Sequence, residues 1–136
     1  MIRTFFSGNI APQYIENMLK FLSYITDAVI IGDRRNYITA LIVIDEENVV
    51  KYAQDHKVQY TTFASLIRTE EVIKLIADEV DKVNKQIARV ENIRKFRLLD
   101  KKLYTEDGEV TPTMKVKRKA INDQYGDLIE EMYKGD

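Results

Sequence analysis

The spacing of hydrophobic residues along the chain predicts two amphipathic helices in its first hundred positions. An apolar residue recurs every three or four positions after Ala11-Pro12, where proline suits a first helical turn. A second, longer stripe follows Thr69, which is a good N-cap residue, and predicts a helix that ends near Asn92. The apolar members of this stripe are Val72, Ile76, Val80, Val83, Ile87 and Val90.

Two runs rich in β-branched residues predict an antiparallel hairpin. They are residues 25–31 (ITDAVII) and 37–45 (YITALIVID), and a turn-forming cluster at 32–36 separates them. Because the second run is apolar at nearly every position, we expect it to lie centrally in its sheet. A third strand is predicted at 95–99 (KFRLL).

Shorter helices and one turn complete the predicted fold. Gly108 stands in the turn 106–109, at a position where a positive φ would favour glycine. Together the elements predict an α+β domain with a small three-stranded, largely antiparallel sheet packed by helices. No linker or repeat divides the chain, so residues 1–136 are read as one domain. The remaining helical segments are predicted at 46–53, 61–67, 115–125 and 128–133.

Composition excludes several classes of site. Hydrophobic residues make up 45% and charged residues 32% of the 136 residues, and the formal net charge is -1. This balance is typical of a globular domain and provides no overall field to attract nucleic acid. The absence of cysteine excludes disulfides and thiolate zinc sites, and a single histidine, His56, argues against a metal centre. A short and quickly polar N-terminus favours a cytoplasmic protein.

The side chains that support self-contained catalysis are missing from the sequence. There is no Walker-type phosphate loop and no serine within a Gly-x-Ser-x-Gly elbow. Acidic residues mostly accompany lysines on helix faces, as Glu79 accompanies Lys82, which favours simple ion pairs. The residues alone therefore predict a domain that does not carry out a reaction by itself.

One stretch concentrates positive charge: Lys115, Lys117, Arg118 and Lys119 fall within five positions. Cations at the start of a helix oppose its macrodipole, which is weak evidence that they meet an anion. Three interpretations stay open: a solvated helix start, a nucleic-acid patch, or a lysine delivered to a phosphate and a carboxylate. The paired arginines of the turn Asp33-Arg34-Arg35 could also contact phosphate, although a charged hairpin tip is usually only solvated.

Three segments, in order and at matching spacings, resemble one family. Residues 9–17 (NIAPQYIEN) resemble the "GGKNIAPxxIEN" that opens the C-terminal domain of AMP-forming long-chain fatty-acid–CoA ligases. Residues 28–45 resemble the following "AVVIGDxRxYxxALIxxD", and residues 107–118 (DGEVTPTMKVKR) resemble the closing "DGELTPTLKVKR". The resemblance covers essentially the whole chain. It departs from the family pattern at Phe5-Phe6-Ser7-Gly8, where the family has a Gly-Gly pair.

The resemblance implies a role in a two-step ligation. Fatty acid and ATP form an acyl-adenylate, and CoA then displaces AMP to give the thioester, with Mg²⁺ accompanying ATP. It implies that Lys115 is the catalytic lysine of the first step and that no metal is held by this domain. Ser7, Gly8 and Asn9 would line the pantetheine tunnel, and Lys117 and Arg118 would be candidates for phosphate contacts.

The same resemblance implies that the nucleotide and acyl pockets lie in an N-terminal domain absent from this chain. That domain, fatty acid, ATP and CoA would be the partners, with no nucleic acid and with peripheral membrane association of the full enzyme. Alone, the chain would be inactive. The alternative hypothesis is a non-catalytic module that binds an anionic partner through its basic stretch.

Overall fold

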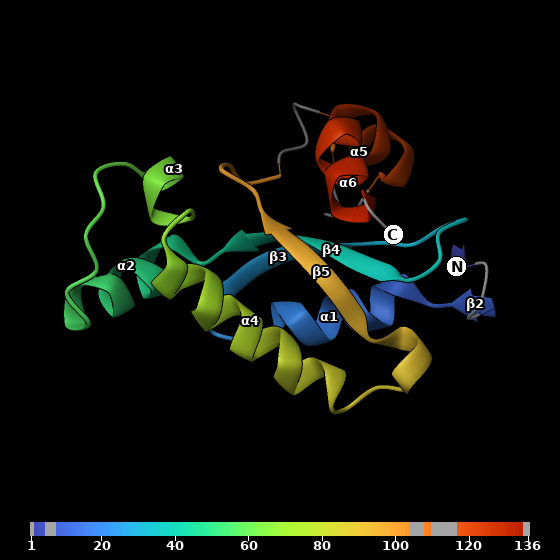
Figure 1. Cartoon of the computed structure of the whole chain (residues 1–136), viewed down its shortest axis with the longest axis horizontal. Helices are drawn as coiled ribbons and strands as arrows, with labels where there is room; N and C mark the ends of the chain where they lie inside the picture. Colours follow the sequence, from blue (N-terminus) through green and yellow to red (C-terminus); the bar gives the residue numbers. More distant parts are fainter. Residues whose placement is uncertain (1, 5–7, 104–107, 110–116, 135–136) are drawn as a thin grey trace.

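The computed structural model describes residues 2–4, 8–103, 108–109 and 117–134. Within these residues a three-stranded sheet carries helices on both faces, and a separate two-stranded sheet lies near the N-terminus (Figure 1). The helices on one face are α1 (Pro12–Lys20) and α4 (Glu70–Asn84); those on the other are α5 (Arg118–Gln124) and α6 (Gly126–Tyr133). The predicted α+β class is confirmed.

The sheet is built on the predicted hairpin. Strands β3 (Ile25–Ile31) and β4 (Ile38–Ile44) pair antiparallel, and β5 (Ile93–Leu98) pairs with the other edge of β4. The order β3-β4-β5 makes β4 central, as its apolar sequence predicts. The third strand runs parallel to β4, because the chain crosses over through three helices before it pairs, and the sheet is therefore mixed.

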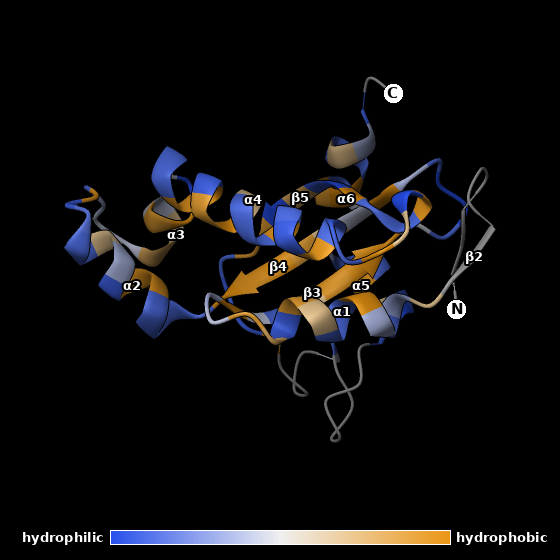
Figure 2. Cartoon of the chain, turned by 90° about the horizontal axis from the view of Figure 1, so that it is seen from below, coloured by the Kyte–Doolittle hydropathy of each residue, from blue (hydrophilic) through white to orange (hydrophobic). Residues whose placement is uncertain are grey.

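Strand β4 is buried at all seven positions because it separates two hydrophobic clusters. Its even-numbered apolar residues, such as Ala40 and Ile42, pack with α1 and α4, whereas Leu41 and Val43 pack with α5 and α6. Successive side chains of a strand point to opposite faces, so a strand covered on both faces must be apolar throughout. Figure 1 shows the sheet between the two pairs of helices, and Figure 2 shows that β3 and β4 are coloured as hydrophobic.

The longest helix, α4, starts as predicted but ends earlier. The Thr69 hydroxyl accepts from Val72 N at 3.3 Å, which confirms the N-cap. The helix ends at Asn84, and the prediction that it reaches Asn92 is wrong. The Asn84 side chain bonds both backbone polar groups of Ile93, at 2.8 Å and 3.0 Å, and so holds the start of β5 against the helix end.

Smaller elements complete the described chain. Between β4 and α4 lie α2 (Glu46–Asp55) and the single-turn α3 (Phe63–Leu66), and a 3₁₀ turn, η1 (Arg89–Glu91), precedes β5. Strands β1 (Ile2–Thr4) and β2 (Gly8–Ile10) pair antiparallel in the separate small sheet. No helix within the described residues has the length and apolar character that a membrane span requires.

Candidate functional site

The candidate catalytic residue, Lys115, lies outside the described residues, but both flanks of its segment are defined. The N–H of Lys117 donates to the carbonyl of Glu109 at 2.9 Å. The chain positions on either side of residues 110–116 are thus joined by one main-chain hydrogen bond. Just before this point Gly108 has a φ of 73°, which confirms the predicted positive φ.

The first flank is held by the carboxylate of Glu109, which has no exposed surface. It accepts from Lys101 Nζ at 2.5 Å and from the hydroxyl of Tyr125 at 2.5 Å. Burial, together with the hydrogen bond to Glu109, raises the pKa of Tyr125 to about 12. This cluster ties the flank to the segment that follows β5 and to the end of α5.

The second flank is held by Arg118, the first residue of α5, which forms a two-pronged ion pair with Glu16 of α1. Nη1 lies 2.9 Å from Glu16 Oε2, and Nη2 lies 2.8 Å from Oε1. The Glu16 side chain is only 5% exposed, and that of Arg118 is 32% exposed. A planar guanidinium that contacts both carboxylate oxygens is fixed in orientation as well as in position.

The same pair covers part of the free edge of the sheet. Strand β3 is an outer strand, and Ile30 N donates to Glu16 Oε2 at 2.8 Å. The Ile30 carbonyl accepts from Arg118 Nη1 at 3.2 Å. Both backbone polar groups of Ile30 are therefore bonded by the pair, which joins α1, β3 and α5 at one point.

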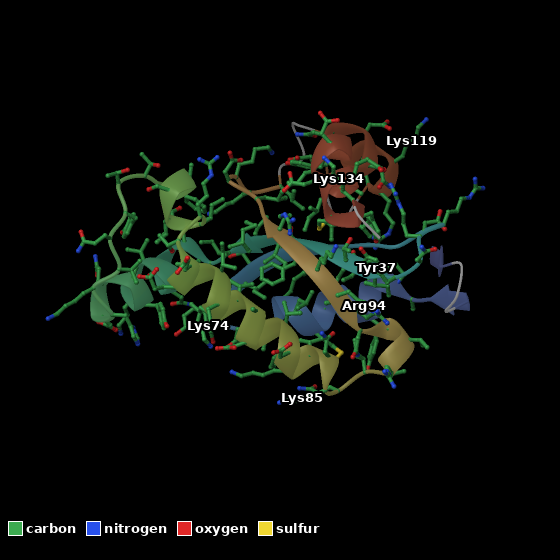
Figure 3. The ribbon with its side chains drawn as sticks, in the orientation of Figure 1. Tyr37, Lys74, Lys85, Arg94, Lys119 and Lys134 are labelled. Carbon is green, nitrogen blue, oxygen red and sulfur yellow. The ribbon has the colours of Figure 1, made fainter. Side chains whose placement is uncertain are left out.

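The other predicted site residues lie on separate parts of the described fold. Gly8 and Asn9 belong to β2, where Gly8 is paired with Thr4 and Asn9 with Arg3, and Ser7 lies outside the described residues. Lys117 is the exposed N-cap residue of α5. Lys119 lies on the first turn of α5, and Figure 3 shows its side chain projecting from that helix.

The paired arginines of the hairpin turn have different environments. Arg34 takes a left-handed conformation with a φ of 60°. Arg35 forms an ion pair with Glu130 of α6, and its guanidinium lies 4.7 Å from the ring centre of Tyr133. The hydrogen bond and charge of Glu130 raise the pKa of Arg35, and Arg35 lowers the pKa of Glu130. Arg35 thus anchors the turn to α6.

A pocket of about 360 Å³ lies between β3 and the two C-terminal helices. Arg118 and Arg35 both line it, as do Asp33 and Glu130. Both arginines already have carboxylate partners within the chain, so the pocket walls have mixed charge. Arg118, a predicted candidate for a phosphate contact, thus lines a surface pocket while its guanidinium is paired with Glu16.

Sequence reasoning missed Glu16, Glu109 and Tyr125. For Glu16 a signal was present: it lies directly after Ile15 and three positions before Leu19, on the buried face of α1. A carboxylate on an apolar helix face needs a buried partner. For Glu109 and Tyr125 the turn and helix patterns contain no comparable signal.

The described residues contain no group of three His, Cys, Asp or Glu side chains placed to share a metal ion. His56 lies on the surface, where its ring stacks on Tyr52 with 4.0 Å between ring centres. Each flank of residues 110–116 is thus held by a buried carboxylate, Glu109 on one side and Glu16 on the other.

The fold defines a class of small α+β domains, and Arg118 of the basic stretch is held by Glu16. Comparison with known proteins identifies the family. A family model described as the AMP-binding enzyme C-terminal domain matches residues 2–136. The chain belongs to this family.

Curated relatives include fatty-acid–CoA ligases. The chain is 36% identical to the long-chain-fatty-acid–CoA ligase FadD15 of Mycobacterium tuberculosis, over 92% of the chain and 21% of that protein. It is 29% identical to the long-chain-fatty-acid–CoA ligase ACSBG1 of Bos taurus, over 92% of the chain and 20% of that protein. The chain thus spans about a fifth of the length of the curated relatives it matches.

Solved structures share the fold at low sequence identity. The adenylation domain of a carboxylate reductase from Mycobacterium chelonae superposes with a TM-score of 0.74 and 21% identity, over 96% of this chain and 19% of that chain. A carboxylic acid reductase didomain from Segniliparus rugosus, in complex with AMP, gives a TM-score of 0.70 and 20% identity, over 91% and 16% of the two chains. These likenesses establish the fold.

Proposed function

We propose that the chain is the C-terminal domain of a long-chain fatty-acid–CoA ligase and supplies Lys115 to ATP-dependent acyl-adenylate formation. The observation that carries the proposal is its 36% identity to a long-chain-fatty-acid–CoA ligase over 92% of the chain, together with the family match over residues 2–136. The substrates are a fatty acid, ATP and CoA, and the partner is the N-terminal domain of the same enzyme.

The physical role of Lys115 follows from where charge gathers during adenylation. The fatty carboxylate attacks the α-phosphate, pyrophosphate leaves, and negative charge is shared between the two reacting groups. An ammonium group that lies between them stabilises this arrangement and needs no unusual pKa. Mg²⁺ enters with ATP and is held mainly by the N-terminal domain.

The second half-reaction uses another part of the domain. CoA displaces AMP from the acyl-adenylate, and we assign one wall of the pantetheine tunnel to Ser7, Gly8 and Asn9. Strand β2, which contains Gly8 and Asn9, supports this proposal because it is extended backbone without a large side chain at Gly8. Exposed Lys117 is the better-placed candidate for a phosphate contact, since Arg118 is paired with Glu16.

The isolated chain is proposed to be inactive, because it spans only about a fifth of the curated relatives and the nucleotide and acyl pockets belong to the remainder. A cytoplasmic location and peripheral membrane association of the full enzyme also remain predictions. The alternative, an interaction module for an anionic partner, would use the basic stretch. Engagement of Arg118 by Glu16 reduces the charge available for that purpose.

The proposal is tested by joining the chain to the N-terminal part of FadD15, in place of that protein's own C-terminal part. Palmitate-dependent exchange between ATP and pyrophosphate measures adenylation. We expect Lys115→Ala to lower the exchange rate about 10²- to 10³-fold, the loss typical of one preorganised charge. Lys119→Ala removes an exposed lysine from the same stretch and should leave the rate within about twofold, the size of a surface effect.

Equal exchange rates for the Lys115→Ala variant and the parent would end the proposed role of this lysine. The anionic-partner alternative has its own test with the isolated chain. Binding to DNA or to phosphatidylserine vesicles that weakens with salt and disappears when Lys117 and Lys119 are replaced would favour it.

A further inference from the structure

We infer that the ion pair between Glu16 and Arg118 positions Lys115 for the adenylation step. The inference rests on the proposed role of Lys115 and adds two residues that contact neither substrate nor reacting atoms. Arg118 and Glu16 would act as positioning residues, by fixing the place from which the lysine extends.

The covalent chain makes this link short. Lys115 precedes Arg118 by three positions, and three extended residues span at most about 11 Å. A shift of Arg118 therefore moves the chain position from which the segment containing Lys115 continues.

The pair holds Arg118 to the rigid part of the domain. Its contacts are two nitrogen–oxygen pairs with Glu16, at 2.9 Å and 2.8 Å, and one hydrogen bond to the Ile30 carbonyl at 3.2 Å. Glu16 is in turn bonded to Ile30 N at 2.8 Å and belongs to the buried face of α1. The consecutive elements α1 and β3 thus define one position and one orientation for the guanidinium of Arg118, which is 102 positions from Glu16.

A second anchor restricts the other end of the same segment. The hydrogen bond from Lys117 N to the Glu109 carbonyl joins the two flanks, and the Glu109 carboxylate is fully buried against Lys101 and Tyr125. Both flanks of residues 110–116 are therefore attached to the rest of the fold, one through Glu109 and the other through Arg118.

Stability alone gives no reason for choosing an ion pair at this place. A buried pair loses much hydration energy, and well-packed apolar residues often stabilise a fold as well or better. A two-pronged arginine–carboxylate contact provides a defined orientation in addition. Catalytic groups depend on such orientation, because a displacement of about 1 Å can cost about 10²-fold in rate.

The experiment uses the same chimera and measures the two half-reactions separately. Adenylation is followed by palmitate-dependent ATP–pyrophosphate exchange, and thioester formation is followed by supplying synthetic palmitoyl-adenylate and CoA. Arg118→Lys keeps the charge but loses the two-pronged contact. Glu16→Gln keeps an acceptor for Ile30 N but removes the carboxylate charge. We expect each variant to lower kcat for exchange by about 10-fold or more, within the range for a misplaced group, with less than about twofold change in the thioester step.

Glu79→Gln is the matched control. Glu79 is another buried glutamate with a basic partner, Lys82 at 2.9 Å, but it lies in α4 and far in sequence from Lys115. A general loss of stability would lower both half-reactions and would appear in the control as well. Thermal unfolding of each chimera identifies any variant that does not fold, and Glu16→Gln decides the question if Arg118→Lys unfolds.

The outcomes separate this inference from the proposed function. If Lys115→Ala lowers exchange while Arg118→Lys and Glu16→Gln match the Glu79→Gln control, the positioning role is overturned and the role of Lys115 stands. Equal losses in both half-reactions would also overturn it, in favour of a purely structural pair. If Lys115→Ala has no effect, the proposed function fails and the positioning role fails with it.

Discussion

The hydroxyl of Tyr125 donates a 2.5 Å hydrogen bond to the carboxylate of Glu109, a side chain with no exposed surface. The donor belongs to the end of α5, and the acceptor directly precedes residues 110–116. This contact therefore connects the C-terminal helices with the segment that contains Lys115.

Replacing Tyr125 by phenylalanine should lower the free energy of unfolding by about 1–2 kcal/mol. A hydrogen bond to a charged group contributes about 1.5–3 kcal/mol, and Lys101 remains as a partner for the carboxylate. Urea unfolding followed by circular dichroism measures the change. Tyr14→Phe, at a 56% exposed tyrosine, is the control and should not shift the midpoint. Equal shifts in the two variants would contradict the assigned contact.

The domain should lose stability in strongly alkaline solution. Burial raises the pKa of both Tyr125 and Tyr133 from the ordinary value of 10.0 to about 12. A raised pKa means that the folded state holds the phenol proton more tightly. The resulting stability is complete below about pH 10 and is lost as the pH rises towards and through about 12.

Urea unfolding at pH values of about 8 and about 11, on either side of the ordinary tyrosine pKa, provides the measurement. The fall in unfolding free energy between the two pH values should be smaller for Tyr133→Phe than for the parent, because phenylalanine has no proton to lose. Tyr14→Phe serves as the exposed comparison. An identical fall in the parent and in Tyr133→Phe would show that this phenol does not drive the alkaline loss.

Asn84 fixes the crossover from α4 to β5. Alanine at this position should lower the free energy of unfolding by about 2 kcal/mol, since it removes two side-chain hydrogen bonds to Ile93 and leaves part-buried backbone groups unbonded. Aspartate retains the acceptor for Ile93 N, so this variant should lose less free energy of unfolding than the alanine variant. Thermal unfolding of the two variants gives the ranking, and a greater loss with aspartate would contradict this account.

Two glycines provide a matched test of backbone conformation. Gly108 has a φ of 73°, and a Cβ at this position would meet no heavy atom within 4 Å, so alanine there is strained without a clash. Gly108→Ala should cost about 1 kcal/mol, the usual penalty for a left-handed residue with a side chain. Gly126→Ala, in open space at the start of α6, should be neutral or slightly stabilising. Equal shifts of the denaturant midpoint in Gly108→Ala and Gly126→Ala would contradict the assigned difference in backbone conformation.

Much of the fold follows from local patterns. The boundaries of β3 are those of the predicted run at 25–31, and the Thr69 cap and the positive φ of Gly108 are where short-range chemistry places them. These features depend on hydrophobic periodicity and on the backbone preferences of single residues. Both signals can be read from a single sequence.

What escaped prediction depends on contacts between distant positions. The apolar spacing continues to Ile87 and Val90, but α4 ends at Asn84, whose side chain bonds Ile93 across the turn. The parallel direction of β5 depends on a crossover of three helices, and no local pattern encodes it.

The anchors of the candidate site escaped prediction for the same reason. Arg118 is read from the sequence as one cation in a basic stretch, since its partner, Glu16, is 102 positions away. Only the folded chain shows that the pair occupies the backbone groups of Ile30. The family resemblance indicates the lysine, and the structure indicates what holds its neighbours.

The two clusters on either face of β4 have no residue in common within the described chain. The strand therefore acts as a partition between a larger compartment under α1 and α4 and a smaller one under α5 and α6. If α5 and α6 separate from the sheet, one face of the sheet is exposed to water while the other face stays covered by α1 and α4. Slow amide exchange should accordingly divide into two tiers, with Ile121 and Ile129 exchanging before Ile15 and Ile76.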